Sequence, residues 1–138
     1  MSMDSADLDA AVLGLYWRIS RRTPRDMSRS AASVLKTLLD NGPTRITELA
    51  KSEAVTQPSM TTLVTRLERD GLVTRTPDPD DARAVRVEIT DEGLQRAARM
   101  RAERAALLDA ALAELEPTER AALEAALPVL EKLSRRNP

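Results

Sequence analysis

Two groups of polar side chains near the middle of this 138-residue chain have the types and spacing of a binding surface. The first lies off the apolar stripe of a predicted helix and offers an amide, hydroxyls and a guanidinium: Gln57, Ser59, Thr61, Thr62 and Arg66. The second is Asp81 and Arg83, in a polar stretch that also contains prolines. Such groups hydrogen-bond to base edges and phosphates in nucleic-acid complexes, although each group could also be an ordinary solvated surface.

The composition excludes most catalytic chemistry. The chain has no cysteine and no histidine, which removes thiol nucleophiles, disulfides, imidazole bases and the usual zinc ligands. The acidic pair Asp80 and Asp81 could serve magnesium or acid–base chemistry, but a proline-rich loop supplies no converging ligands. We therefore expect a protein that is not an enzyme and that holds no metal or other cofactor.

Length and hydropathy indicate one small folded domain, or one such domain with an oligomerisation extension. Of the residues, 42% are hydrophobic and 31% are charged, which suits a folded protein and not one that spans a membrane. The first residues include Asp4, Asp7 and Asp9 and lack the basic and apolar regions of a secretory signal. We expect a cytoplasmic protein without a membrane partner.

The core must be built almost without aromatic side chains, because Tyr16 and Trp17 are the only two. Leucine and alanine favour helices over sheets, so the chain should be mostly helical. Apolar spacing predicts a helix over residues 7–20 and a second helix that begins after the N-cap Ser28 and stops at the Asn-Gly-Pro sequence of 41–43. Tyr16 and Trp17 are expected to fill a core or an interface, with a ligand pocket as the alternative.

A helix-turn-helix is predicted next. Residues 44–46 form an extended stub, and Arg45 within it is a further candidate contact residue. Thr47 is the predicted N-cap of a short helix over 48–52, and Thr56 is the predicted N-cap of the helix that follows. Pro58 suits the first turn of that second helix, and its core stripe repeats at helical spacing: Met60, Leu63, Val64 and Leu67.

Beyond Gly71 the apolar period changes from that of a helix to that of a strand. Residues 72–75 and 85–89 are the predicted strands of a β-hairpin, joined by a polar loop over 76–84. Thr90 should cap a long helix that reaches residue 115, and a last helix follows over 117–133. This order predicts a mainly α fold with a small β-hairpin wing (α+β), a winged helix-turn-helix with flanking helices. Its geometry suits duplex DNA, since the major groove admits a helix and the minor groove a loop with a basic side chain.

Three runs in this region, over residues 66–75, 78–87 and 89–93, resemble the MarR family of bacterial transcriptional regulators. The most specific part is the wing motif, in which Asp81-x-Arg83 is followed by Ile89-Thr90-x-x-Gly93. Similarity continues upstream through residues 33–35 and 46–50, so it covers about 28–93, and the flanking helices match by architecture.

The resemblance implies a homodimer that represses, or occasionally activates, by binding a pseudo-palindromic operator in double-stranded DNA. It implies that the helix from Thr56 reads the major groove, that Arg83 enters the minor groove and that Asp81 orients this arginine. It also implies dimerisation through the terminal helices, often with a small-molecule effector bound between the dimerisation and DNA-binding parts. Tyr16 and Trp17 are the candidate pocket, and a repressor that responds to no ligand is the alternative. The expected division is a dimerisation helix and connector over 7–27, a DNA-binding domain over 28–90 and dimerisation helices over 91–134.

The sequence departs from the family pattern in three places. The connection between the first two helices is short, and without cysteine a thiol-oxidation switch is impossible. Glu116 stands where a serine or threonine cap is expected, and Pro128 should kink the last helix because it removes a backbone hydrogen bond.

The net charge of -1 at first argues against a nucleic-acid partner, but charge is unevenly distributed. Residues 15–30 contain five arginines and one aspartate, so this stretch is either a solvated surface or a set of phosphate contacts. The modest local charge predicts weak, salt-sensitive non-specific binding. The alternative from another functional class is a winged-helix module that binds a protein.

Overall fold

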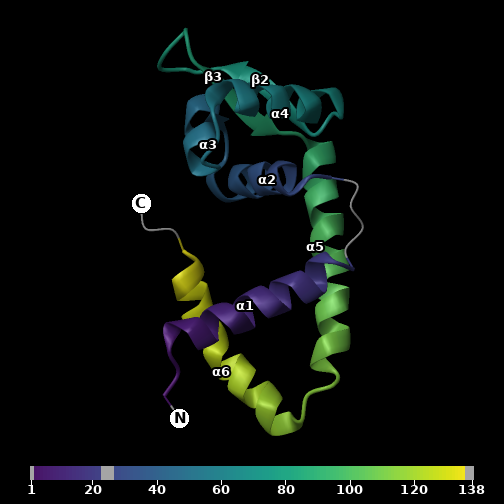
Figure 1. Ribbon diagram of the computed structural model, residues 1–138. Coiled ribbons are helices and arrows are strands. Elements are labelled where there is room, and N and C mark those ends of the chain that lie inside the picture. The colour runs from purple at the N-terminus through teal and green to yellow at the C-terminus, as the bar shows by residue number, and fades with distance from the viewer. Residues whose placement is uncertain (1, 23–26, 136–138) are drawn as a thin grey trace. The chain divides into compact units, whose positions relative to one another are not determined.

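The computed structural model describes residues 2–22 and 27–135. Along the chain, the helices and strands are α1 (Ser5–Ser20), α2 (Arg29–Asn41), β1 (Thr44–Arg45), α3 (Ile46–Ser52), α4 (Gln57–Arg69), β2 (Val73–Pro77), β3 (Val85–Ile89), α5 (Asp91–Leu112) and α6 (Pro117–Ser134) (Figure 1). The chain divides into two compact units, one of residues 1–22 with 103–138 and one of residues 23–102. The predicted mainly α fold with a small wing is confirmed.

The unit of residues 23–102 is built around one apolar core. Its buried side chains come from α2, α3, α4 and the strands, and the predicted stripe of α4 is among them, with Met60, Val64 and Leu67 buried and Leu63 packed at the edge. Burial of this stripe is the main stabilising contribution of α4, because apolar area is removed from water. The same packing leaves the opposite face of α4 exposed.

Local capping explains where the helices begin. The hydroxyl of Ser28 accepts a hydrogen bond from the backbone N–H of Ala31, and that of Thr56 accepts one from Ser59, so both predicted N-caps are confirmed. The predicted cap at Thr47 is wrong. The helix α3 already begins at Ile46, because Arg45 belongs to a strand that pairs with β3 and thereby sets the entry of the helix.

The predicted hairpin is part of a three-stranded antiparallel sheet in the order β1-β3-β2. The strand predicted over 72–75 begins at Val73 and continues to Pro77, since the pairing with β3 extends through Pro77 and Val85. The short strand β1 pairs Thr44 with Val87 and Arg45 with Arg86. The loop between β2 and β3 extends beyond the sheet (Figure 1), and residues 78–84 are called the wing loop below.

The start of α5 is locked onto the turn after α4. The hydroxyl of Thr90 donates to the carbonyl oxygen of Gly71 at 2.6 Å and accepts from the backbone N–H of Gly93 at 3.0 Å, which confirms the predicted cap. A Cβ on Gly93 would overlap the carbonyl oxygen of Leu72 and crowd the Ile89 side chain. Any side chain at this position therefore requires the nearby backbone to shift.

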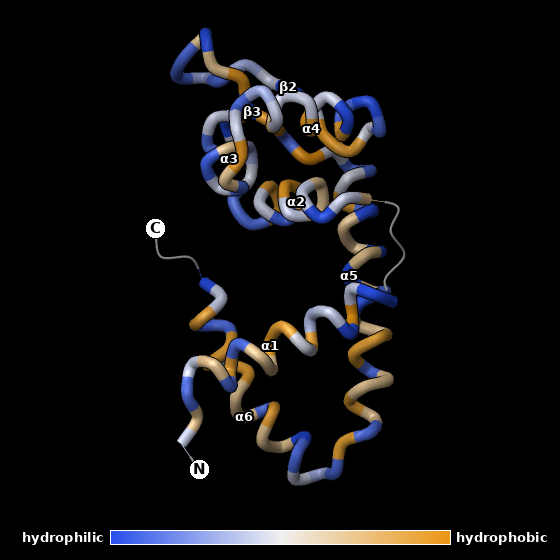
Figure 2. The backbone as a smooth tube through the Cα atoms, in the orientation of Figure 1, coloured by the Kyte–Doolittle hydropathy of each residue, from blue (hydrophilic) through white to orange (hydrophobic). Residues whose placement is uncertain are grey.

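The helices α1 and α6, which belong to the unit of residues 1–22 and 103–138, bury little. No residue of α1 or α6 is buried, and large apolar side chains are exposed on both: Val12, Leu13, Leu15, Leu123, Leu127, Val129, Leu130 and Leu133. Figure 2 shows apolar residues recurring along these helices. An exposed apolar surface of this extent typically marks an interaction surface. None of the helices in residues 2–22 and 27–135 has the length and apolar character needed to span a membrane.

The C-terminal elements differ in detail from the prediction. The helix α5 ends at Leu112, not 115, because the next residues form tighter turns such as that from Leu115 N to Leu112 O. Glu116 replaces the expected serine or threonine cap through a reciprocal capping box with Glu119. The helix α6 continues through Pro128 to Ser134, and the kink there stays a prediction.

We expect Gly93→Ala to lower the free energy of unfolding by about 1–3 kcal/mol, because the new methyl group meets a backbone carbonyl that cannot turn aside. Urea titration followed by circular dichroism measures this. Gly14→Ala is the matched control, since Gly14 also lies in a helix and a methyl group added there would meet no atom within 4 Å. That control should gain about 0.5–1 kcal/mol, and equal effects at the two sites would contradict the packing account.

Candidate nucleic-acid interface

The exposed face of α4 carries all five of its predicted contact residues. Gln57, Ser59, Thr61, Thr62 and Arg66 are all exposed and lie outside the buried stripe of the helix. The Gln57 amide makes no hydrogen bond within the described part of the chain, and the Thr62 hydroxyl donates to the Pro58 carbonyl oxygen at 3.1 Å. The face thus offers one amide, several hydroxyls and one guanidinium on a rigid element.

An arginine that the sequence analysis did not single out fixes the C-terminal half of α4 to the sheet. The Arg75 guanidinium, from β2, pairs with Glu68 at 3.1 Å and donates to the Thr65 hydroxyl at 2.7 Å. The backbone N–H of Arg75 donates to the same carboxylate at 3.2 Å. Arg75 therefore holds the helix and the wing strand in one fixed arrangement, and its place in the family-like run was the only sequence signal.

At the tip of the wing loop, Asp81 and Arg83 lie together as predicted. The Asp81 carboxylate accepts a hydrogen bond from the backbone N–H of Arg83 at 3.0 Å and lies 3.7 Å from the Nε of its guanidinium. The Arg83 side chain is 95% exposed, so an ion pair of this kind adds little stability. Its exposure instead leaves the guanidinium available to a partner, and its contact with DNA stays a prediction.

Arg45, a further predicted contact residue, lies in β1 and pairs with a residue of the wing loop. Its guanidinium forms a two-point ion pair with Asp78, with Nε to Oδ2 at 2.7 Å and Nη2 to Oδ1 at 3.1 Å. The Asp78 side chain is only 4% exposed, and its Oδ1 also accepts from the backbone N–H groups of Asp80 and Asp81. Sequence reasoning missed Asp78, because its partner is 33 residues away and no local pattern reports such a pair.

The surroundings of Asp78 favour its charged form. The hydrogen bond from Arg45 lowers the pKa of the Asp78 carboxyl to about 2, with the backbone N–H of Asp80 adding to the effect. The same hydrogen bond raises the pKa of the Arg45 guanidinium above its ordinary value. Both groups are therefore ionised throughout the physiological range.

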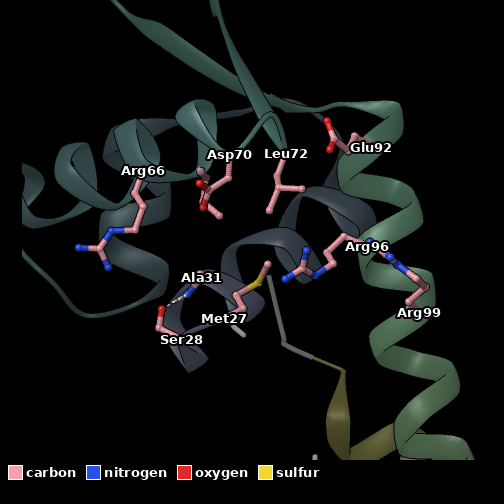
Figure 3. A pocket seen from close by; sticks show the side chains of 10 residues that line it. Met27, Ser28, Ala31, Arg66, Asp70, Leu72, Glu92, Arg96 and Arg99 are labelled. Atoms are coloured by element: carbon pink, nitrogen blue, oxygen red, sulfur yellow. Dashed lines mark hydrogen bonds between the residues drawn. The ribbon is translucent and has the colours of Figure 1, made fainter. Parts of the chain in front are cut away.

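A hollow of about 470 Å³ lies between the start of α2, the end of α4 and α5. Figure 3 shows Met27, Asp70 and Arg96 among the side chains around it. Its charged lining comprises three arginines and two acids: Arg66, Arg96, Arg99, Asp70 and Glu92. One of these, Arg66, also belongs to the exposed face of α4.

Tyr16 and Trp17 belong to the other compact unit and do not line this hollow. Their rings make an edge-to-face contact with centroids 5.6 Å apart. Trp17 borders an open hollow together with Arg18, Arg21 and Arg22, and Arg18 pairs with Glu114 at 3.3 Å. The effector role of the two aromatics stays a prediction.

The ion pair of Asp78 should make stability depend on pH in a defined window. Because the pKa of Asp78 is lower in the folded chain, its ionised form stabilises the fold above a pH of about 4, and this contribution is lost as the pH falls to about 2. The melting temperature of the unchanged protein should exceed that of Asp78→Asn at neutral pH, and the gap should shrink across this window. A gap that stays constant down to pH 2 would contradict the ion pair.

Sequence comparison supports a regulator of transcription. The profile of the MarR family matches residues 27–85, which run from the start of α2 into β3. An uncharacterised HTH-type transcriptional regulator from Mycobacterium bovis is 33% identical over 135 residues, which cover 97% of this chain and 94% of the relative.

Solved structures of transcriptional regulators have the same fold as this chain. The crystal structure of a Pseudomonas aeruginosa protein assigned as a transcriptional regulator has a TM-score of 0.81 at 32% identity and covers 96% of this chain and 94% of its own. BpsR of Bordetella bronchiseptica, whose DNA binding is regulated by 6-hydroxynicotinic acid, has a TM-score of 0.61 at 25% identity, with 93% and 98% covered. The chain therefore belongs to the MarR family of winged helix-turn-helix regulators of transcription, and it is not an enzyme.

Proposed function

We propose that this protein is a homodimeric repressor that binds a pseudo-palindromic operator in double-stranded DNA, in the cytoplasm. The observation that carries the proposal is the exposed polar face of α4 beside a wing loop whose Arg83 is 95% exposed. A helix that packs by one face and presents amide and hydroxyl groups by the other can enter the major groove. A basic side chain at a loop tip can enter the minor groove, where it meets enhanced negative potential.

The roles follow from side-chain chemistry. Gln57 offers the amide that pairs with adenine, and Ser59, Thr61 and Thr62 offer hydroxyls and methyl groups to base edges. Arg66 would contact guanine or a phosphate, and Arg83 the minor groove with Asp81 as its orienting partner. The arginines between Arg18 and Arg29 are expected to contact flanking phosphates, which affects all sequences alike.

Dimerisation is supported by the apolar side chains that a single chain leaves exposed on α1 and α6. A second copy that covers them would remove this apolar area from water. A twofold dimer presents two copies of α4 to half-sites about one helical turn apart, which matches a pseudo-palindromic operator. Bound over a promoter, such a dimer represses by excluding other proteins.

Arg83→Ala should weaken operator binding about tenfold or more, in line with about 1–3 kcal/mol for a lost base contact, and leave the fold and the dimer unchanged. The operator is first selected from fragments of the organism's own genome, and binding is titrated at fixed salt. Arg101→Ala is the matched control, since it removes an exposed arginine of α5 outside the proposed DNA-binding surface.

The protein-interaction alternative makes the opposite prediction, namely no binding to mixed genomic DNA even at low salt. Unchanged operator affinity in Arg83→Ala would refute the wing assignment, whereas Gln57→Ala should alter which fragments are selected. Selection of identical fragments by Gln57→Ala would remove this residue from the readout of bases.

An effector site is proposed at the hollow of about 470 Å³ beside α4, which has the size of a small-molecule pocket. Its three arginines and two acids give a positive balance that favours a small anion. The regulation of BpsR by 6-hydroxynicotinic acid supports an aromatic carboxylate as the class to examine. Because Arg66 borders both the hollow and the exposed face of α4, an anion there would compete with DNA for this side chain.

A panel of aromatic carboxylates should raise the melting temperature and release the operator, and Arg99→Gln should abolish both effects. Trp17, the only tryptophan, distinguishes this hollow from the predicted pocket at Tyr16 and Trp17. A ligand that quenches its fluorescence and acts equally on Arg99→Gln would place the effector at the aromatic pair instead.

A further inference from the structure

The ion pair of Arg45 and Asp78 joins β1 to the base of the wing loop. We propose that Arg45 is a positioning residue and not a DNA contact: together with Asp78 it holds the wing loop in the shape that presents Arg83. This inference rests on the proposed function, because it assigns a role in DNA binding to a side chain that does not touch DNA.

The geometry of the ion pair and the burial of Asp78 make Arg45 unavailable for a contact with DNA. Two nitrogens of its guanidinium bond the two oxygens of one carboxylate, at 2.7 and 3.1 Å. Such two-point pairs are the strongest and most directional contacts that arginine makes. Since Asp78 is almost fully buried, a phosphate that drew Arg45 away would leave a buried carboxylate without its counter-charge, which is strongly unfavourable.

Asp78 also holds the backbone of the wing loop through hydrogen bonds. Its Oδ1 accepts hydrogen bonds from the backbone N–H of Asp80 at 2.8 Å and of Asp81 at 3.1 Å. Its own N–H donates to the carbonyl oxygen of Ala84 at 3.1 Å, which closes the loop where its two ends meet. One carboxylate thus organises both the entry and the turn of the wing loop.

The last link runs from Asp81 to Arg83. With its backbone fixed by Asp78, Asp81 accepts from the N–H of Arg83 at 3.0 Å and sets where that guanidinium projects. The contacts therefore form a continuous series from Arg45 through Asp78 and Asp81 to Arg83. A loop ordered before binding loses less conformational entropy on the DNA, so this series should contribute to affinity.

The direction in which DNA affinity changes when the charge of Asp78 is removed tests whether this residue positions the wing loop. Removing an acid near DNA normally raises affinity, because repulsion from phosphates is lost. If Asp78 positions the loop, Asp78→Asn should instead weaken operator binding several-fold. Asp80→Asn is the matched control, since it makes the same charge change in the same loop and its carboxylate has no partner within the described residues. Its affinity should be unchanged or higher.

The salt dependence of binding tests Arg45. In the proposed dimer the substitution occurs twice, so loss of a phosphate contact in each chain would reduce the slope of log affinity against log salt by about two, whereas loss of a positioning residue leaves the slope unchanged. We expect Arg45→Met to weaken binding several-fold at an unchanged slope. The double variant with Asp78→Asn should be no weaker than either single variant, because both remove the same interaction.

Limited trypsin digestion measures the mobility of the wing loop in the absence of DNA. Trypsin cleaves after Arg83 only when the wing loop is mobile, so Asp78→Asn and Arg45→Met should be cut there several-fold faster than the unchanged protein and Asp80→Asn. Circular dichroism confirms that each variant keeps its helices. Failure of the unchanged protein to bind DNA would refute the proposed function, while the cleavage rates would still decide whether the pair orders the loop.

Unchanged cleavage after Arg83 in both variants would overturn the proposal. So would an Arg45→Met variant whose salt slope is lower by about two per dimer, since that result makes Arg45 a phosphate contact in each chain. An Asp78→Asn variant that binds as tightly as Asp80→Asn would overturn it as well.

Discussion

The burial of Met60, Val64 and Leu67 in a core shared with α2, α3 and the sheet determines which side of α4 remains free. Because three apolar side chains in register must be removed from water, the helix cannot rotate without exposing them. Its polar residues are thereby held outward as a set. The exposed surface of α4 is thus a consequence of packing, and the proposed readout of DNA depends on the core beneath it.

Electrostatic links extend this rigidity from the core to the wing. Arg75 joins β2 to Glu68 and Thr65 of α4, and Arg45 joins β1 to Asp78 at the base of the wing loop. Both arginines are partly buried and hydrogen-bonded, unlike Arg83, which is the most exposed of the three. The same residue type therefore has two uses in this unit, internal support and a free guanidinium for a partner.

Features with a local cause could be predicted from the sequence. The caps at Ser28, Thr56 and Thr90 and the stripe of α4 each follow from residues within a few positions of one another. Features that depend on distant pairing could not. The extended stub predicted over residues 44–46 contains β1, but no local pattern indicates its pairing with β3, and this pairing is what made the predicted cap at Thr47 wrong. The pairing of Arg45 with Asp78 could not be predicted for the same reason. The contact roles of the exposed residues on α4 stay predictions, because they depend on how the helix meets DNA.

In the proposed complex, two copies of α4 and of the wing read one symmetric site, and hydroxyl-radical footprinting of a selected operator tests this arrangement most directly. The predicted result is a dyad-symmetric pattern with two protected segments about one helical turn apart and minor-groove protection that disappears in Arg83→Ala. A footprint without twofold symmetry, or one that Arg83→Ala leaves intact, would contradict the account.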